Sequence, residues 1–201
     1  SRSRNHKVGN YNMNATGKYW VPLLGLLTGA RLNELCQLCP QDVSEVEGIW
    51  CLSIVDEGEN QKIKNNASRR TVPIHSRLIE LGLLNLVADR QRQETALLFP
   101  EFKINKYGYY SRSMSDFFSN HLEALDIKTK KTSFHSLSHS FISECRNAGV
   151  PMDHRKAITG HSEGGMGARY GSWKRSPSPL KDSIEKVSFE DVPFSGLPVY
   201  S

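Results

Sequence analysis

Four short segments, far apart in the chain, contain side chains that can bind or attack a phosphate. They are Thr28–Leu35, Lys62–Pro73, His135–His139 and Thr159–Gly171. Arginine and lysine bind phosphate oxygens, histidine moves protons near neutral pH, and a tyrosine such as Tyr170 provides an oxygen nucleophile. This combination of side chains suits the transfer of a phosphoryl group.

Taken alone, each segment also has an explanation that involves no chemistry. Arg31 fits a solvated charge at a helix corner, the lysine-rich segment fits a solvated loop, and a lone tyrosine usually packs in a core. His135 and His139 are one helical turn apart, which suits a metal pair, but no HExxH glutamate or evident third ligand accompanies them. We therefore expect neither a metal nor a cofactor.

The cysteines allow a second metal or redox hypothesis, which the surrounding sequence does not favour. Cys36 and Cys39 form a CxxC, but they stand in an apolar helical run, and no second CxxC or HxxxH completes four ligands. Buried, reduced thiols of a cytoplasmic protein are the simpler interpretation, for Cys51 and Cys145 as well.

The chain predicts a mainly α-helical fold with one small antiparallel β-sheet. Residues 18–38 repeat apolar side chains at three- and four-residue spacings and are interrupted at Thr28-Gly29-Ala30, so two helices meeting at a corner are expected. Residues 49–55 and 70–74 are strand-like, and the polar stretch 56–68 predicts a long hairpin loop between them. Further helices are predicted over residues 77–92, 112–124, 136–148, 151–158 and 179–187.

The positive charge is gathered in a few places. A formal net charge of +5 is only a weak indication of an acidic partner, but clustered lysines and arginines are what bind a polyanion. The clusters comprise Lys62, Lys64, Arg69 and Arg70, and then Lys128, Lys130 and Lys131. No run of about 18 apolar residues occurs, so no membrane partner is expected.

In order and spacing, the four segments resemble the sequence boxes of the tyrosine recombinase, or phage integrase, family. The boxes are TGxRxxEL at Thr28–Leu35, a lysine hairpin at Lys62–Pro73, HxLRH at His135–His139 and GHxxxxxxxxY at Gly160–Tyr170. Each box alone has many chance matches, whereas all four together are hard to reach by accident. The likeness extends over residues 17–173 and implies the catalytic-domain fold of that family.

The resemblance implies which residues bind the phosphate. Arg31 would be the first catalytic arginine, Glu34 would orient it, and His161 would donate to a phosphate oxygen. The family pattern His-x-x-Arg puts a second arginine where this chain has Ser138. Serine is short and neutral, so we expect a protein that binds DNA and cleaves it very poorly. An engineered substitution, which the other intact positions favour, and a naturally decayed enzyme both account for it.

The resemblance also implies how protons move. Tyr170 would be the nucleophile and His135 the proton acceptor. Lys64, counted back from Val72-Pro73, would protonate the leaving sugar oxygen, with Lys62 as the alternative. The product would be a 3′-phosphotyrosine, which the 5′-hydroxyl of another strand can reverse without ATP or metal.

The implied function is site-specific cleavage and rejoining of DNA strands by a phage or prophage integrase with reduced activity. Its expected partners are double-stranded DNA attachment sites and further protomers on DNA, and its expected location is the cytoplasm, with the nucleoid. The candidate DNA-binding residues are Lys62, Arg69, Arg70, Lys130 and Lys131. A catalytically silent DNA-binding relative remains the alternative, while short box spacing and the TGAR motif disfavour a DNA-relaxing topoisomerase.

We divide the chain into three parts. Residues 1–10 are expected to be a linker or an expression remnant, residues 11–174 the catalytic domain, and residues 175–201 a C-terminal tail. The apolar residues of the tail would either dock onto a neighbouring protomer, as such segments of this family often do, or fold back on their own domain. A full-length protein, with an N-terminal DNA-clamping domain, is expected to begin upstream.

Overall fold

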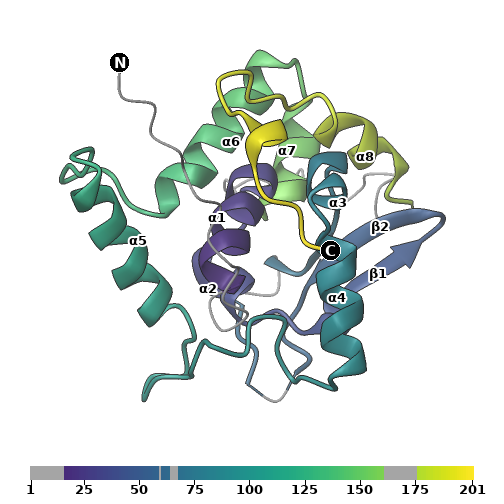
Figure 1. The fold of residues 1–201 in the computed structure, drawn as a ribbon. Helices are drawn as coiled ribbons and strands as arrows, with labels where there is room; N and C mark the ends of the chain where they lie inside the picture. Colours follow the sequence, from purple (N-terminus) through teal and green to yellow (C-terminus); the bar gives the residue numbers. More distant parts are fainter. Residues whose placement is uncertain (1–15, 59, 64–67, 161–175) are drawn as a thin grey trace.

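The structure, a computed structural model, describes residues 16–58, 60–63, 68–160 and 176–201. Its elements are α1 (Thr16–Thr28), α2 (Leu32–Cys36), the 3-10 turn η2 (Pro40–Asp42), β1 (Val43–Val46), β2 (Ile49–Ile54), β3 (Arg70–Pro73), α3 (Ser76–Glu80), α4 (Leu83–Arg92), α5 (Arg112–Ala124), α6 (His135–Asn147), α7 (Met152–Thr159), α8 (Ser178–Ile184) and the 3-10 turn η6 (Phe194–Gly196). The described residues are mainly helical around one three-stranded antiparallel sheet, which confirms the predicted fold class (Figure 1). Within these ranges, no helix has the length and apolar character needed to cross a membrane.

The corner between α1 and α2 depends on a glycine. Gly29 has a φ of +65°, a left-handed conformation that ends α1. Thr28 closes the turn, because its Oγ1 donates to the Leu24 carbonyl and accepts the Ala30 amide. A Cβ at position 29 would lie 2.7 Å from the ring of Phe141 in α6, so glycine also permits close packing on that helix. The predicted interruption of the helix is confirmed.

The sheet has the strand order β1–β2–β3, and both strand pairs are antiparallel. Glu47 and Gly48 join β1 to β2 with φ values of 51° and 77°, as in the two-residue turns that match the twist of a hairpin. The strands β2 and β3 were predicted, and they pair with Leu52 opposite Val72. The sequence does not predict β1, because four residues are too few for a clear alternation.

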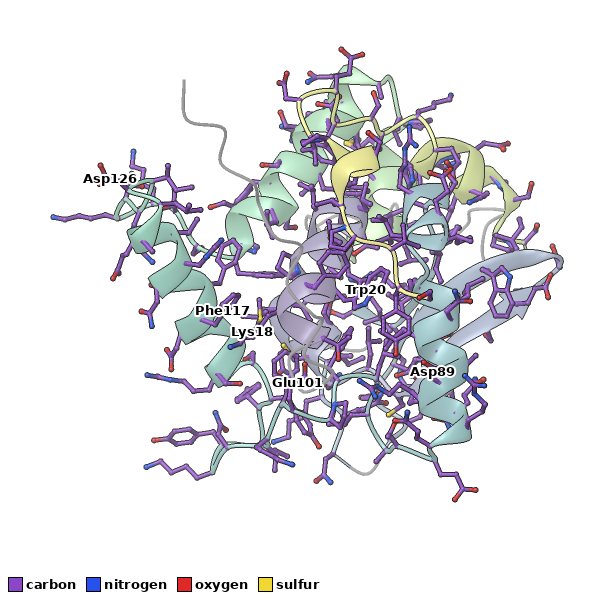
Figure 2. The ribbon with its side chains drawn as sticks, in the orientation of Figure 1. Lys18, Trp20, Asp89, Glu101, Phe117 and Asp126 are labelled. Atoms are coloured by element: carbon purple, nitrogen blue, oxygen red, sulfur yellow. The ribbon has the colours of Figure 1, made fainter. Side chains whose placement is uncertain are left out.

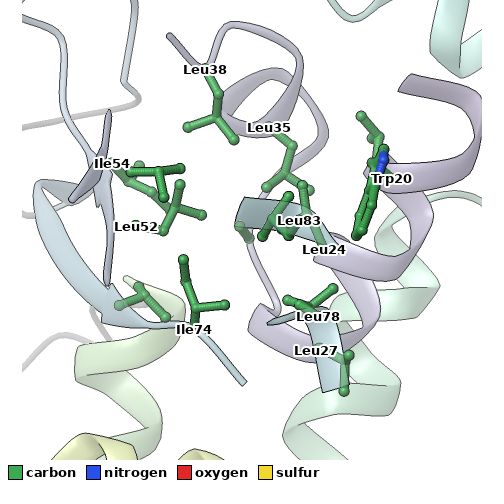
Figure 3. Close-up of a cluster of buried hydrophobic side chains, with 14 of the residues drawn as sticks. Trp20, Leu24, Leu27, Leu35, Leu38, Leu52, Ile54, Ile74, Leu78 and Leu83 are labelled. Atoms are coloured by element: carbon green, nitrogen blue, oxygen red, sulfur yellow. The ribbon is translucent and has the colours of Figure 1, made fainter. Parts of the chain in front are cut away.

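The core lies where α1 and α2 face the sheet, α3 and α4 (Figure 3). Its large, fully buried side chains include Trp20, Leu24, Leu27, Leu35, Leu38, Leu52, Ile54, Ile74, Leu78 and Leu83. Leu24, Leu27 and Leu35 of the two N-terminal helices thus point inward, as residues at three- and four-residue spacings on one helix face do.

The helix α5 stands at the edge of the molecule, and Met114 is its one fully buried residue (Figure 1). Two aromatic contacts fasten it to the body. The rings of Phe118 and Phe134 lie 5.3 Å apart, edge to face. The ammonium of Lys18 in α1 lies 4.8 Å from the ring centre of Phe117 (Figure 2). Most other residues of α5 are exposed, while Ser119 and Leu122 are partly buried.

The prediction of a single helix over residues 77–92 is wrong, because the structure has two helices there. The helix α3 ends at Glu80, α4 begins at Leu83, and Gly82 between them has a φ of +91°. An apolar spacing that continues through both helices concealed the break. A Cβ at position 82 would collide with the carbonyl oxygen of Tyr200, so the C-terminal residues occupy the space beside the break.

The C-terminal tail folds back on its own domain, which is one of the two expected arrangements. The helix α8 packs against β3 and α7, with Leu180 and Ile184 buried (Figure 1). Further along, the Tyr200 amide donates to the Leu81 carbonyl at 2.9 Å, and the Tyr200 hydroxyl donates to the Asp89 carboxylate at 2.8 Å. Leu180, Ile184 and Val187 of the tail are therefore buried within the same chain, whereas Val199 is exposed.

Two glycines form a matched pair that tests this docking. Gly82→Ala adds left-handed strain of about 1–2 kcal/mol and also displaces the tail. Gly48 has a φ of +77°, but nothing lies within 4 Å of its Cβ, so Gly48→Ala adds the strain alone. We expect urea unfolding to show a clearly larger loss of stability for Gly82→Ala. Removal of residues 197–201 should make the two losses equal, and equal losses in the complete chain would contradict the docking.

His75 connects the tail to the start of α3. Its Nδ1 accepts the Arg77 amide at 3.0 Å, so its Nε2 carries the hydrogen that is donated to the Val187 carbonyl at 3.1 Å. Burial lowers the pKa of His75 below its ordinary value; Glu185 opposes this shift, while Lys181 and Arg77 add to it. The ring is therefore neutral when the tail is docked.

The pKa of His75 makes stability depend on pH. The histidine of the unfolded chain, with a pKa of about 6.5, takes up a proton before the folded one does. The contribution of His75 is therefore complete above that pH and is lost as the pH falls toward the lower folded-state pKa. Between about pH 7 and pH 5 we expect the parent chain to lose more stability than His75→Gln, whose amide can replace both hydrogen bonds. The prediction is wrong if the free energies of unfolding of the two proteins, measured in urea, fall by the same amount over this pH range.

Candidate active site

Arg31 stands at the beginning of α2, where Glu34 binds it twice. One carboxylate oxygen, Oε2, accepts the Arg31 backbone amide at 3.0 Å, and the other, Oε1, accepts the guanidinium Nη1 at 2.7 Å. Glu34 is 3 % exposed, and a carboxylate in the first turn also stabilises the start of so short a helix. The carboxylate thus sets the direction in which the guanidinium leaves the helix.

Two further elements reach the same guanidinium. Arg31 Nη1 donates to the Ser68 hydroxyl at 3.3 Å, at the end of the hairpin loop, and Nη2 donates to the Gly160 carbonyl at 3.3 Å, just after α7. The Arg31 side chain is still 26 % exposed. The cation is therefore held in place and remains open to an anion from solvent.

His135, the first residue of α6, lies within the electrostatic reach of Arg31. Its ring and that of His139 have centres 4.6 Å apart and are inclined at 77°. Partial burial lowers the pKa of His135, and the charges of His139 and Arg31 lower it further. At neutral pH the imidazole is thus mostly neutral, the form that can accept a proton.

Ser138 lies one turn further along α6, against the corner that carries Arg31. It is 2 % exposed, and its hydroxyl donates to the Gly29 carbonyl at 2.8 Å. Gly29 precedes Arg31 by two residues. The position at which the family pattern has an arginine therefore adjoins the Arg31 corner.

Of the predicted catalytic residues, the structure describes Arg31, His135 and Ser138. The other three, Lys64, His161 and Tyr170, lie outside the described residues. The described part of the site contains a cation that Glu34 fixes, an imidazole whose pKa that cation lowers, and a buried hydroxyl bonded to the corner before the cation. Such an arrangement can bind an anion and accept a proton.

The DNA-binding candidates differ in exposure. Lys130 and Lys131 are exposed beyond α5. The Arg69 side chain is 43 % exposed and pairs with the carboxylates of Asp56 and Glu57 on its own hairpin.

Arg70 does not lie on the surface, where a DNA contact would have to be. Its side chain is 5 % exposed and donates to the Glu34 carboxylate at 2.8 Å. Neighbouring residues of an extended chain point to opposite sides, so one arginine of the Arg69-Arg70 pair turns outward and the other inward. A pair of adjacent charges does not reveal which one is buried.

Lys62 is held at both its backbone and its side chain. Gln37 accepts the Lys62 amide at 2.9 Å and donates to the Lys62 carbonyl at 3.0 Å. The Lys62 ammonium donates to the Tyr107 carbonyl at 3.2 Å and lies 5.6 Å from the ring centre of Tyr109. The ammonium is therefore engaged by the loop that precedes α5.

Sequence reasoning missed two amide side chains that connect these parts. Asn33 donates to Gln37 at 2.9 Å, and its own oxygen accepts the backbone amides of Tyr110 at 2.9 Å and Ser111 at 3.3 Å. Gln37 is 1 % exposed. A pair of amides four residues apart in a leucine-rich helical run is the signal that was available, because buried polar groups are paired.

The described residues contain no cluster of three or more His, Cys, Asp or Glu side chains arranged as metal ligands would be. Cys36, Cys51 and Cys145 are buried. Burial, with a smaller effect of Asp42, raises the pKa of the Cys39 thiol to about 11, so it is protonated at neutral pH.

Comparison with known proteins connects this geometry to one family. A family model described as the phage integrase family matches residues 8–174. No curated protein sequence matches the chain.

Among solved structures, the chain is similar to an integrase from mycobacterium phage Brujita, with 16 % identity, a TM-score of 0.58, and coverage of 90 % of this chain and 54 % of that one. It is also similar to the XerH site-specific recombinase. In the pre-cleavage complex with difH substrate the identity is 18 %, the TM-score 0.55, and the coverage 90 % and 45 %. In the post-cleavage complex with palindromic difH substrate the identity is 19 % and the TM-score 0.53, with coverage of 78 % of this chain and 42 % of that one. The chain thus spans 42–54 % of the length of these structures, and the likeness shows a shared fold.

The Gln37 connection can be tested apart from any reaction. Gln37→Leu leaves the Lys62 amide and carbonyl without their partner, which should cost about 1–3 kcal/mol in urea unfolding. Amide hydrogen exchange at Lys62 should become faster. Asn85→Ala, which removes an exposed amide bond to Tyr200, is the matched control and should leave Lys62 exchange unchanged. Slow exchange at Lys62 in Gln37→Leu would show that Gln37 does not hold the hairpin.

Proposed function

The chain belongs to the phage integrase family, and on that basis we propose that it forms the catalytic part of an enzyme that cleaves and rejoins DNA strands at specific sites. The observation that carries the proposal is the Arg31 guanidinium, which is held in place yet 26 % exposed. Its charge lowers the pKa of His135, and Ser138 donates to the Gly29 carbonyl, two residues before Arg31. The occurrence of all four sequence boxes in the family order supports the proposal.

The proposed reaction is a transesterification. The Tyr170 hydroxyl oxygen forms a bond to the scissile phosphorus while the bond from phosphorus to the 5′-oxygen of the sugar breaks. The phenol proton passes to His135, and Lys64 supplies a proton to the leaving oxygen. The 3′-phosphotyrosine keeps the bond energy, so a 5′-hydroxyl of another strand can reverse the step.

Two electrostatic requirements of this reaction match the described residues. Charge on the non-bridging phosphate oxygens needs a cation that is already in position, as Arg31 is, with His161 proposed as a second donor. A tyrosine hydroxyl has a pKa near 10, so ionising it at pH 7 costs roughly 4 kcal/mol unless the site helps. A neutral imidazole at His135 and the positive field of Arg31 would both reduce that cost.

The proton donor is better assigned to Lys64 than to Lys62. The Lys62 ammonium is engaged by the Tyr107 carbonyl and lies over the Tyr109 ring, and its backbone is tied to Gln37. A general acid must be able to approach the leaving oxygen. Lys62 is thus better suited to binding DNA beside the site than to moving a proton within it.

We propose double-stranded DNA and further protomers bound to that DNA as the partners. The net charge of +5 and the exposed cations Lys62, Arg69, Lys130 and Lys131 support a DNA-binding surface. The XerH structures similar to this chain are complexes with difH substrate, which supports the same partner. A phage or prophage is the proposed source, with insertion of a viral genome as the proposed task.

Ser138 is proposed to reduce the rate of cleavage. Its side chain ends at the Gly29 carbonyl and carries no charge. Loss of an arginine at a phosphoryl-transfer transition state costs about 10³ to 10⁵ in rate. The same observation favours a second candidate function, that of a catalytically silent DNA-binding relative.

A nicked DNA site that traps the covalent intermediate distinguishes the two. Ser138→Arg should raise the rate of covalent adduct formation by about 10³ or more, because it returns the second cation to the phosphate. Ser138→Ala is the matched control; it removes the bond to Gly29 without adding charge and should not raise the rate.

Tyr170→Phe in the Ser138→Arg background should abolish the adduct, since the proposed nucleophile is gone. If Ser138→Arg forms no more adduct than the parent, Ser138 is not what limits the reaction. Adduct that persists in Tyr170→Phe would rule out the proposed nucleophile.

A further inference from the structure

The Arg70 guanidinium uses all three of its nitrogens on three different parts of the fold. Nη2 donates to the Glu34 carboxylate of α2 at 2.8 Å, Nη1 donates to the Ser68 carbonyl of the hairpin at 2.8 Å, and Nε donates to the Ile158 carbonyl of α7 at 2.8 Å. With 5 % exposure, the side chain has no open face for a DNA phosphate. Arg70 therefore connects elements that are distant in the sequence.

The end of α7 provides a hydrogen-bond acceptor for the Arg70 side chain. The last carbonyls of a helix have no partner within it, and the one on Ile158 accepts from Arg70. The carbonyl of Gly160, just after α7, accepts from Arg31. Gly160 has a φ of +66°, and a Cβ there would lie 2.6 Å from Arg70 Nη1. The two arginines thus approach the negative end of the α7 dipole side by side.

The charges explain why a second, buried arginine is needed. Glu34 is almost fully buried, and a lone buried carboxylate would pair with Arg31 and cancel its charge. Here Arg70 supplies the buried counter-charge, so two arginines share one carboxylate and one positive charge remains. Burial alone would raise the pKa of Glu34, but the charge of Arg70 and hydrogen bonds from both arginines lower it below its usual value. Glu34 therefore stays ionised.

We propose that Arg70 is a positioning residue: it holds Glu34 and the end of α7 so that Arg31 is presented to the phosphate in a fixed direction and with uncancelled charge. This inference rests on the proposed function and deepens it. It replaces the sequence-based interpretation of Arg70 as a DNA contact. Arg70 itself touches neither the phosphate nor the reacting atoms.

A double-mutant cycle on DNA affinity tests the proposal without any covalent chemistry. Arg31→Met should reduce the slope of log affinity against log salt by about 0.9, the value for one lost phosphate contact. Arg70→Met should cause a similar reduction, because Glu34 is then left to pair with Arg31 alone and cancels its charge. The double variant should lose no more than either single one, because the effects are coupled. The same cycle with Arg69→Met, an exposed neighbour, should be additive.

The reaction supplies the second measurement. In the Ser138→Arg background and at saturating DNA, Arg70→Met should lower the rate of adduct formation about 10²-fold, the usual effect of losing one positioned donor. Arg70→Lys should not rescue it, since the three N–H groups of an ammonium share one nitrogen and cannot reach three acceptors that the guanidinium reaches with three separate nitrogens. Arg70→Met combined with Glu34→Gln removes the buried carboxylate that has lost one of its two arginines, so this double variant should unfold at a higher urea concentration than Arg70→Met. Its rate should stay low, because neither Arg70 nor the carboxylate then fixes the direction of Arg31.

The outcomes separate the two proposals. Additive loss in the Arg31–Arg70 cycle would make Arg70 a DNA contact, and an unchanged slope and adduct rate in Arg70→Met would leave it without influence on Arg31; either result overturns the inference. Full recovery of the rate in the Glu34→Gln combination would show that Arg70 affects only the charge of Arg31 and not its direction, and would also overturn the inference. Absence of adduct in every variant would instead refute the proposed function, while the affinity cycle would still decide the role of Arg70.

Discussion

The candidate site depends on one buried carboxylate, that of Glu34. It accepts a guanidinium on each of its two oxygens, from Arg31 on one side and Arg70 on the other. Each arginine in turn reaches the hairpin at Ser68 and the end of α7. Removing one partner of such a network leaves an uncompensated buried charge, so the group is stable only as a whole. The one negative charge of Glu34 lies between two arginines, so one positive charge remains, and the partly exposed Arg31 presents it to solvent.

The fold around Glu34 is arranged to bring distant segments to this point. The left-handed Gly29 turns the chain between α1 and α2, and this corner lies against α6, where Ser138 donates to the Gly29 carbonyl and Phe141 packs on the glycine. The amides of Asn33 and Gln37 extend the same short helix to the hairpin and to the loop before α5. One helix of five residues and its first following turn thus contact most of the elements that approach the site. The stability of α2 comes from these contacts, since so short a helix does not form alone.

Much of this architecture could be predicted from the sequence, because apolar residues recur at helical spacings and because glycines mark where helices end. Apolar spacing indicated α1, α2, α5 and α6, and the glycine at position 29 marked the corner. Where prediction failed, the deciding partner is distant in the chain. The break at Gly82 depends on Tyr200, and β1 is defined by its partner strand rather than by its own pattern.

The site residues divide in the same way. The sequence boxes indicated Arg31, Glu34 and His135, because their order and spacing carry information. The inward direction of Arg70 and the bonds of Gln37 to Lys62 could not be predicted, because each depends on where α7 or the hairpin comes to lie. The sequence shows which residues carry a charge, but the tertiary structure decides which of these side chains are buried.

The hydrogen bond from Ser138 to the Gly29 carbonyl has a consequence at the level of the cell. The serine is buried and its hydroxyl is paired with the Gly29 carbonyl, so a serine in place of an arginine leaves neither of these two described groups without a partner. Protein quality control acts on unfolded molecules and has no reason to remove this one. If the proposed function holds, such a protein would accumulate at ordinary levels and occupy the DNA sites that an active copy needs. A gene copy that encodes this chain would then interfere with an active copy in the same cell, so its effect would be dominant and not a simple loss of activity.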